Sequence, residues 1–238
     1  MTIYRKAARP FPARVLGFVP KRRVGLLGGS FNPAHAGHRH IAELALKHLD
    51  LDEVWFLVSP GNPLKNGTDM APLAVRLASA AAISRHPRLR AVAVEQALGT
   101  RFTADTLAAL IRRFPRTSFV WLMGADNLAQ IPRWERWPLI FKSVPIAIFA
   151  RPSYSTKALA GKAVHRFSTA RLRPRHGAAR LASRKPPAWV FLHTRLHPAS
   201  ATSIRARRAA NGWKQGAAPG KEVDVETVQG DRYPDPQA

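Results

Sequence analysis

Short apolar runs alternate with longer segments of helical spacing along most of the chain. An apolar run bounded by Gly, Pro or polar residues is typical of a buried strand, and apolar residues three and four apart are typical of an amphipathic helix. The strands that we expect span residues 24–28, 54–58, 91–94, 118–123, 144–150 and 189–192. The helices that we expect span residues 37–49, 72–85, 103–114 and about 200–210.

Strands that alternate with helices predict an α/β fold with a Rossmann-like parallel sheet and helices on both faces. Pro72 suits the first position of its helix, and Thr103 is the expected cap of the next helix. Residues 151–188 are basic and rich in Ala, and no regular pattern assigns them. In sheets of this kind ligands bind beyond the carboxyl ends of the strands, which is where the sharpest motifs of this chain fall.

The composition along the chain predicts a division into three segments. Residues 1–22 contain three prolines among basic residues and are expected to form a flexible arm. Residues 23–210 hold the predicted strands and helices and are expected to form one domain, and residues 211–238 are expected to be a disordered tail.

The formal net charge of +24 is distributed unevenly. Residues 24–150 carry 14 bases against nine acids, whereas residues 151–215 carry 15 bases and no acid. Such an excess suits an anionic partner such as a nucleotide, a nucleic acid or a membrane surface, and it also suits plain solubility in an Arg-rich proteome. Arginine without interleaved aromatic residues gives no stacking platform, and no nucleic-acid-binding motif is visible, so nucleic acid is not the expected main partner.

Several classes of function are excluded by what the sequence does not contain. There are no cysteines, which removes disulfides, thiolate metal sites and cysteine nucleophiles. No apolar run reaches 18 residues, and no apolar signal core follows the basic N-terminus, so we expect a cytoplasmic protein without a membrane partner. The oligomeric state is not determined by the sequence, and a homo-oligomer is compatible with it.

The segment GGSFNPAHAGH at residues 28–38 carries the chemistry. Two glycines after a strand let the backbone pass close to a ligand and turn its N–H groups toward it. His35 and His38 share one face if a helix starts here, and a helix start attracts phosphate through its free N–H groups and its dipole. Imidazoles at that place can stabilise charge on phosphoryl oxygens as a bond breaks.

Residue types and spacing alone leave two alternatives open for this segment. It lacks the Gly-Lys-Ser/Thr of a Walker loop and the GxGxxG of a dinucleotide fingerprint. Two His at this spacing can share a zinc ion, but no HExxH or cysteine supplies further ligands, so no protein-bound metal is expected. A purely structural loop with two surface histidines is the second alternative.

The segment resembles the signature of the HxGH nucleotidyltransferases, Gly-Gly-x-Phe-Asp-Pro-x-His-x-Gly-His, with Asn32 in place of Asp. Residues 200–205 (SATSIR) are similar to the family's Ile-Ser-Ser-Thr-x-Ile-Arg signature, with Ala201 in place of the second Ser. Hydroxyls at a helix start and a forked Arg205 make a seat for phosphates, although helix capping alone would also explain Ser200 and Thr202. The resemblance implies a nucleotidyltransferase domain over residues 23–210.

Three further stretches resemble the nicotinate mononucleotide adenylyltransferases within that family: NPLK at 62–65 with Arg76, RFTADTL at 101–107, and WLMGADNL at 121–128 followed by Trp134. Phe102 stands where that group has Tyr. Trp134 offers a flat face for a pyridine ring, or else packs in the core. Lys65 can reach phosphate from a loop or simply be solvated, and Asp105 is interpreted as a helix charge rather than a base.

The resemblance implies the site residues. Catalysis is assigned to His35, His38 and Arg205. The ATP-binding residues are these three with Gly28, Gly29, Ser30, Phe31, Gly124, Asp126, Ser200 and Thr202. The acceptor-binding residues are Asn32, Lys65, Phe102, Thr103 and Trp134.

The implied reaction joins ATP and nicotinate mononucleotide to give deamido-NAD and pyrophosphate in NAD biosynthesis. The acceptor phosphate is already anionic, so no general base is needed, and Mg²⁺ is expected to be bound with ATP rather than in a protein cage. The alternatives are another acceptor, nicotinamide mononucleotide or phosphopantetheine, and, in a different class, a basic nucleic-acid-binding protein.

Overall fold

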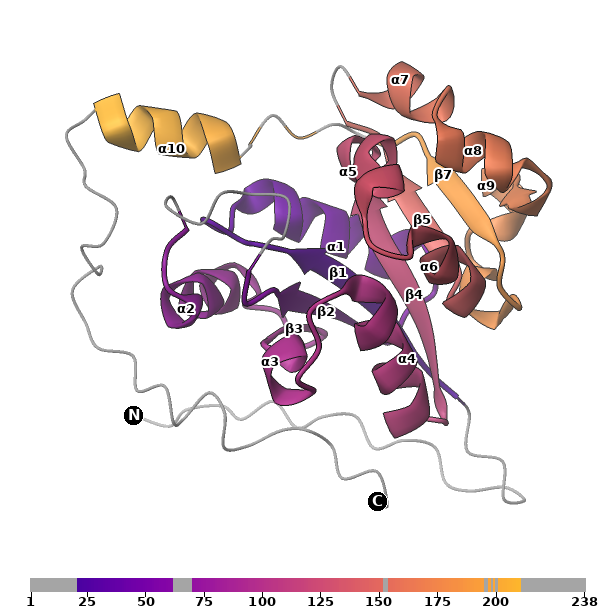
Figure 1. Cartoon of the computed structure of the whole chain (residues 1–238), viewed down its shortest axis with the longest axis horizontal. Coiled ribbons are helices and arrows are strands. Elements are labelled where there is room, and N and C mark those ends of the chain that lie inside the picture. The colour runs from indigo at the N-terminus through magenta and orange to yellow at the C-terminus, as the bar shows by residue number, and fades with distance from the viewer. Residues whose placement is uncertain are drawn as a thin grey trace, which may run out of the picture.

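A computed structural model describes residues 21–61, 70–151, 154–194, 197, 199 and 201–210 (Figure 1). The expected N-terminal arm, up to residue 20, and the expected C-terminal tail lie outside these residues. Lys65 and Ser200 lie outside them as well, so the roles that we expect for them stay predictions. No helix in the described ranges is both long and apolar enough to cross a membrane.

The described residues build one seven-stranded sheet in which every strand pairing is parallel. The strands lie in the order β3-β2-β1-β4-β5-β7-β6. Their bounds are β1 Arg22–Gly29, β2 Glu53–Val58, β3 Leu89–Val92, β4 Thr117–Gly124, β5 Ile146–Phe149, β6 Arg171–Leu172 and β7 Trp189–Leu192. The first strand thus begins at Arg22, the last residue of the expected arm.

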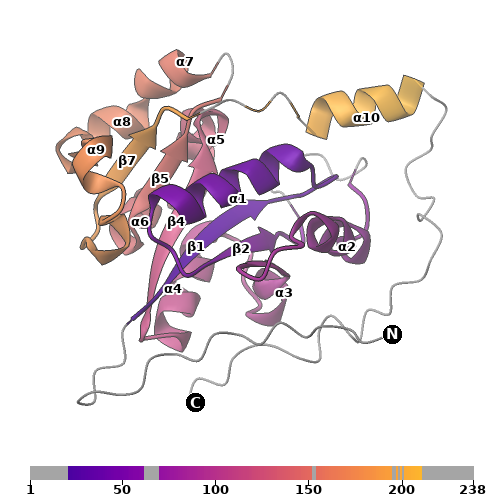
Figure 2. The same ribbon diagram turned by 180° about the vertical axis from the view of Figure 1, so that it is seen from behind.

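Helices cover both faces of this sheet, as Figures 1 and 2 show from opposite sides. The α-helices are α1 Ala36–His48, α2 Leu73–Ile83, α3 Val94–Ala97, α4 Thr103–Arg113, α5 Ala125–Gln130, α6 Trp137–Ser143, α7 Ser155–Leu159, α8 Lys162–Arg166, α9 Pro174–Gly177 and α10 Ala201–Ala210. Short 3₁₀ turns lie at η2 Ile131–Arg133, η3 Ser168–Ala170 and η4 Leu181–Ser183. The expected Rossmann-like α/β fold is confirmed.

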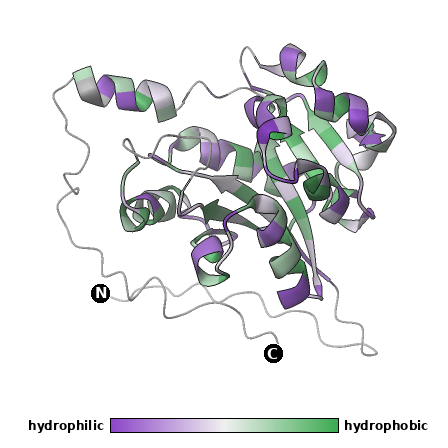
Figure 3. Ribbon diagram, viewed as in Figure 1, coloured by the Kyte–Doolittle hydropathy of each residue, from purple (hydrophilic) through white to green (hydrophobic). Residues whose placement is uncertain are grey.

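The core is two apolar layers, one on each face of the sheet. Successive strand residues point to opposite faces, so Leu26 packs with α3, α4 and α6, and the next residue, Leu27, packs with α1 and α2. β2 and β5 are buried along their whole length because helices cover both of their faces, and apart from Glu53 at the start of β2 their residues are apolar. Figure 3 shows this pattern as hydrophobic strands at the centre and hydrophilic residues on the outer sides of the helices.

The predicted elements agree with the structure within a few residues, with two corrections at helix starts. Pro72 is the N-cap of α2 rather than its first residue. Thr103 is the first residue of α4, and Phe102, with an extended backbone, is its N-cap without a side-chain cap bond. The Phe102 carbonyl accepts from the N–H groups of Asp105 and Thr106, so the helix begins on a backbone carbonyl and needs no hydroxyl. The sequence pattern also missed the short elements α3, α5, α6 and β6.

The binding edge of the sheet is set by its topology. From β1 the chain winds outward to β2 and β3, and then crosses back to place β4 on the other side of β1. The β1–β4 pair is therefore the switch point, beyond whose carboxyl end ligands bind in open α/β sheets. Gly29 ends β1 and Gly124 ends β4, so both glycine-containing motifs open at this point.

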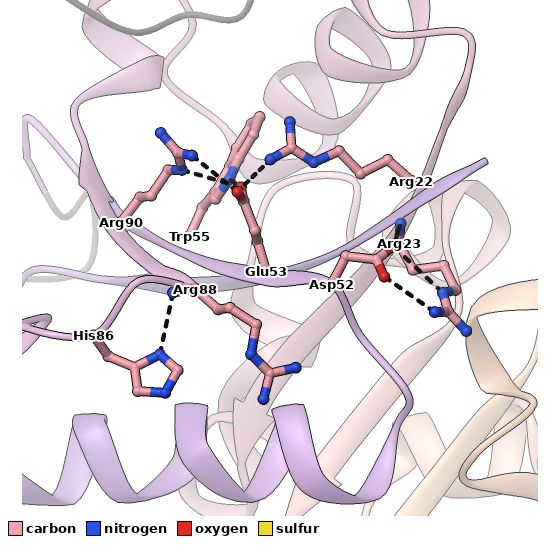
Figure 4. Close-up of polar contacts among 8 residues, drawn as sticks. All are labelled: Arg22, Arg23, Asp52, Glu53, Trp55, His86, Arg88 and Arg90. Carbon is pink, nitrogen blue, oxygen red and sulfur yellow. Dashed lines mark hydrogen bonds and ion pairs between the residues drawn. The ribbon is translucent and has the colours of Figure 1, made fainter. Parts of the chain in front are cut away.

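The opposite edge of the sheet carries an ionic cluster that ties the starts of three strands together (Figure 4). Glu53 at the start of β2 is buried and accepts from Arg22 on β1, from Arg90 on β3 at 2.9 and 3.1 Å, and from the Trp55 indole at 3.0 Å. Because a buried carboxylate without its partners is strongly destabilising, this cluster serves stability, at the end of the sheet remote from the motifs.

Candidate active site

The two motif histidines form the start of α1. His35 is the N-cap, and its Nδ1 accepts from the Gly37 N–H at 3.2 Å. His38 Nδ1 accepts from the His35 N–H, also at 3.2 Å, and the two ring centroids are 3.8 Å apart. A neutral imidazole carries one ring proton, so in both rings that proton is on Nε2. The helix start therefore holds two Nε2–H donors, because the backbone N–H groups bonded to Nδ1 fix the tautomer of each ring.

Both imidazoles are held neutral. Burial, followed by the positive charge of Arg151 and then His197, lowers the pKa of His35 to about 4. Burial lowers the pKa of His38 well below its usual value, with smaller effects from His35 and Arg151. Neutral donors can hydrogen-bond to phosphoryl oxygens without a proton having to be taken up first.

The Phe31 side chain packs against the His38 ring. Its ring is 1% exposed, lies 4.7 Å from the His38 ring and 5.6 Å from the Phe56 ring, and so belongs to the core. Phe31 has a φ of 48°, the left-handed region, which turns the loop so that the ring can enter the core. For a ligand, Phe31 therefore has only its backbone N–H to offer.

Gly37 allows a second segment to cross the helix start. A Cβ at this position would lie 3.0 Å from the His35 ring and 3.1 Å from the Ala199 carbonyl oxygen. Because residue 37 has no side chain, the chain between β7 and α10 can pass close above α1 without having to shift. This contact brings the second motif, which is about 165 residues later in the sequence, to the first.

Arg205 joins α10 to the motif loop. Its Nη1 donates to the Asn32 carbonyl oxygen at 2.7 Å. The Asn32 side chain accepts from the Ala71 N–H at 3.3 Å, a bond that an Asp could also accept, so the departure from the family motif keeps this contact. Thr202 is exposed one turn before Arg205, and Figure 2 shows α10 beyond the carboxyl end of β1.

Asp126 and Arg151 face each other across the end of β4. Arg151 Nε donates to Asp126 Oδ1 at 3.2 Å, and a Cβ on Gly124 would overlap this carboxylate. Arg151 lies two residues after the end of β5, so it stands at the carboxyl edge of the sheet, and its charge also acts on both histidines. Sequence reasoning missed Arg151; its position immediately after a buried apolar run was the available signal.

On the other face, aromatic residues line the same edge. The Trp121 ring lies over Gly28, and Trp134, which is partly buried, meets it edge to face at a centroid distance of 6.5 Å. The Trp121 Nε1 is buried and has no hydrogen-bond partner among the described residues. Phe102 lies under the guanidinium groups of Arg101 and Arg136 at 5.6 and 5.9 Å. Asp105 lies in the first turn of α4 and forms an ion pair with Arg136.

The structure thus brings the first motif and Arg205 together, and it sets Asp126 beside Gly124 at the neighbouring strand end. Thr103 begins α4 on the face that carries Trp134. Within the described ranges, no group of three or more His, Asp or Glu side chains is arranged to hold a metal ion.

Comparison with known proteins decides the family. The family model described as cytidylyltransferase-like matches residues 26–207. A protein of Cereibacter sphaeroides named probable nicotinate-nucleotide adenylyltransferase is 54% identical over 183 residues, which are 77% of this chain and 96% of that protein. A protein of Methylorubrum extorquens with the same name is 48% identical over 78% of this chain and its own whole length.

The chain belongs to the nicotinate-nucleotide adenylyltransferases of the cytidylyltransferase-like family. The fold agrees with a solved structure, the Plasmodium falciparum nicotinic acid mononucleotide adenylyltransferase complexed with NaAD, at a TM-score of 0.56 and 14% identity. That match covers 78% of this chain and 83% of the other. The resemblance that the two motifs indicate is confirmed, and the chain is a nucleotidyltransferase.

The low pKa of His35 predicts how stability depends on pH. Its pKa is near 4 in the folded protein and near 6.5 when unfolded, so its contribution is fully present above pH 6.5 and is lost as the pH falls toward 4. His35→Asn keeps an N-cap acceptor but does not titrate. Between pH 7.5 and pH 4.5 the free energy of unfolding of the wild type should therefore fall by about 1–3 kcal/mol more than that of the variant. Urea unfolding at the two pH values measures this difference. An unchanged difference between the two proteins at both pH values would contradict it.

Glu95 in α3 predicts the opposite trend. Its burial raises the pKa to about 7 from the usual 4.5. Since the folded state favours the protonated form, stability is lost as the pH rises from 4.5 through 7. Glu95→Gln should therefore be more stable than the wild type by roughly 1–3 kcal/mol at pH 8 and equal to it near pH 4.5. Thermal unfolding at the two pH values checks this; an equal gain at both would mean that Glu95 does not titrate in this range.

Proposed function

We propose that this enzyme transfers the adenylyl group of ATP to nicotinate mononucleotide, giving deamido-NAD and pyrophosphate in NAD biosynthesis. The observation that carries the proposal is the pair of neutral, backbone-anchored imidazoles at the start of α1. The choice of acceptor is supported by the names of the two relatives, which are about 50% identical to this chain and are matched over nearly their whole length.

In this reaction an oxygen of the acceptor's 5′-phosphate attacks the α-phosphorus of ATP. A new P–O–P bond forms, and the bond from the α-phosphorus to its bridging oxygen breaks, with the electron pair leaving on pyrophosphate. The nucleophile is an anion at neutral pH, so the enzyme has to align the groups and stabilise the charge that develops. His35 and His38 are suited to this through Nε2–H donors at the α- and β-phosphates.

The leaving pyrophosphate is assigned to α10. Arg205 already lies at the motif loop, and Thr202 with the N–H groups of the first turn of α10 adds donors at a positive helix end. We extend this set to Ser200. The motif loop contributes the N–H groups of Gly29, Ser30 and Phe31, and Gly28, which has no side chain, lets the Trp121 ring pack against the strand.

The acceptor is assigned to the Trp134 side of the edge. Its pyridine ring stacks on Trp134, and its carboxylate is received by the N–H groups at the start of α4, between Phe102 and Thr103. Asn32 and Lys65 complete the acceptor-binding residues. On the ATP side, Asp126 holds a ribose hydroxyl, and Arg151, paired with it, supplies charge for a phosphate. We expect Mg²⁺ to enter with ATP, bound to its phosphates.

The direct test incubates the purified protein with Mg-ATP and each of three acceptors: nicotinate mononucleotide, nicotinamide mononucleotide and phosphopantetheine. We expect deamido-NAD from the first, at a kcat/KM well above that for the other two. Absence of product from nicotinate mononucleotide would overturn the proposal, and a higher kcat/KM for another acceptor would reassign the substrate.

A further inference from the structure

Arg76 on α2 is a buried arginine whose hydrogen bonds all go to backbone carbonyls. Only 2% of the residue is exposed. Its Nε donates to the Ala71 oxygen at 2.8 Å, its Nη1 to the Ser30 and Ser59 oxygens at 2.8 and 2.6 Å, and its Nη2 to the Pro60 oxygen at 3.0 Å. No carboxylate in the described ranges pairs with it. A buried cation without a counter-ion is costly unless its position serves another purpose.

The four carbonyls come from three segments that meet at the carboxyl edge of the sheet. Ser30 follows β1, Ser59 and Pro60 follow β2, and Ala71 precedes α2. Figures 1 and 2 both show α2 beside the carboxyl ends of β1 and β2, next to the motif loop. Ser59 and Ala71 each precede a proline, so their peptides have no N–H. Arg76 therefore gathers carbonyls from a region in which regular backbone pairing is limited.

The bond to Ser30 has a consequence for ligand binding. In a trans peptide the C=O and the following N–H point in opposite directions. Because Arg76 holds the Ser30 oxygen inward, the Phe31 N–H points away from the guanidinium, and it has no protein partner among the described residues. The Phe31 ring, fixed under His38, prevents this peptide from turning over.

We infer that Arg76 is a positioning residue for phosphate binding: it turns the Ser30 carbonyl away from the site and the Phe31 N–H into it. Its buried positive charge lies close to the same loop. This inference rests on the proposed use of ATP, and it deepens it by naming the group that orients the loop. Arg76 is assigned no contact with the substrate, because four of its five N–H donors are turned to the four carbonyls.

The test compares Arg76→Lys with Arg90→Lys. Each keeps the charge and loses the fork of donors, but Arg90 belongs to the ionic cluster at the opposite edge of the sheet. Calorimetric titration with Mg²⁺ and an ATP analogue that has a methylene bridge between the α- and β-phosphates needs no acceptor. We expect Arg76→Lys to bind the analogue about 10- to 100-fold more weakly, the effect of a lost hydrogen bond to a charged group, and Arg90→Lys to bind it like the wild type.

Circular dichroism establishes that each variant is folded at the assay temperature. Equal binding by folded Arg76→Lys and by the wild type would overturn the inference, as would equal weakening in both variants. If Arg76→Lys does not fold, the Phe31 amide resonance of the wild type decides: the analogue should shift it, and an unshifted resonance overturns the inference. A wild type that binds the analogue but makes no deamido-NAD would refute the proposed acceptor and leave this inference standing.

Discussion

His38→Asn is expected to lower kcat by about 10²- to 10³-fold with little loss of stability, the usual cost of removing one donor to a developing oxyanion. An Asn oxygen can accept the His35 N–H in place of Nδ1, so the helix start is kept. The shorter side chain cannot place a donor where Nε2–H stands. Because the lost interaction strengthens as charge moves onto the phosphoryl oxygens, kcat should fall more than KM for ATP rises.

His48→Asn at the last residue of the same helix is the matched control. His48 is exposed and lies at the opposite end of α1 from the site, so its replacement should leave kcat unchanged. The measurement is steady-state formation of deamido-NAD, with thermal unfolding of each variant alongside it. Equal kcat in the two Asn variants would show that His38 serves only the start of the helix and not the chemistry.

The sheet and its switch point could be predicted because buried strands leave a simple trace in sequence. Runs such as Trp189–Leu192 are apolar on both faces, and the structure begins and ends that strand at the predicted residues. Local motifs were equally accessible, since Gly37 and the histidines on either side of it are neighbours in the sequence. The helices within residues 154–183 were not predicted, because they are four or five residues long and so too short to show a helical period.

What the sequence could not show is contact between segments that are distant in the chain. The bond from Arg205 to the Asn32 carbonyl spans 173 residues and joins a side chain to a backbone group, which has no residue-type signature. The pairing of Arg151 with Asp126 depends on β4 and β5 being neighbours in the sheet. At Thr103 the predicted cap is wrong. Thr103 is a favourable capping residue, but the backbone is still extended at Phe102, so Phe102 is the N-cap and Thr103 is the first residue of the helix.

Arg205→Ala is expected to lower kcat/KM for ATP by about 10²- to 10³-fold, because in our proposal Arg205 stabilises the leaving pyrophosphate, and its bond to the Asn32 carbonyl holds α10 against the motif loop. The kcat/KM of Arg205→Lys should lie between that of the wild type and that of Arg205→Ala, since a lysine keeps the charge but loses the planar fork that can bind two phosphate oxygens. Inhibition by pyrophosphate separates the two roles. If Arg205 contacts the leaving group, the inhibition constant for pyrophosphate should rise in step with the loss of kcat/KM.

The control for this prediction is Arg207→Ala on the same helix. Arg207 is exposed, whereas Arg205 is partly buried against the loop, so the two variants remove the same charge from α10 at different places. A general field effect would weaken ATP use alike in both, and salt would reduce it. A direct contact of Arg205 with the leaving group would instead weaken ATP use only in Arg205→Ala. Equal kinetics in the two variants would therefore assign α10 a purely electrostatic role, and the leaving group would have to be held by the motif loop and the two histidines alone.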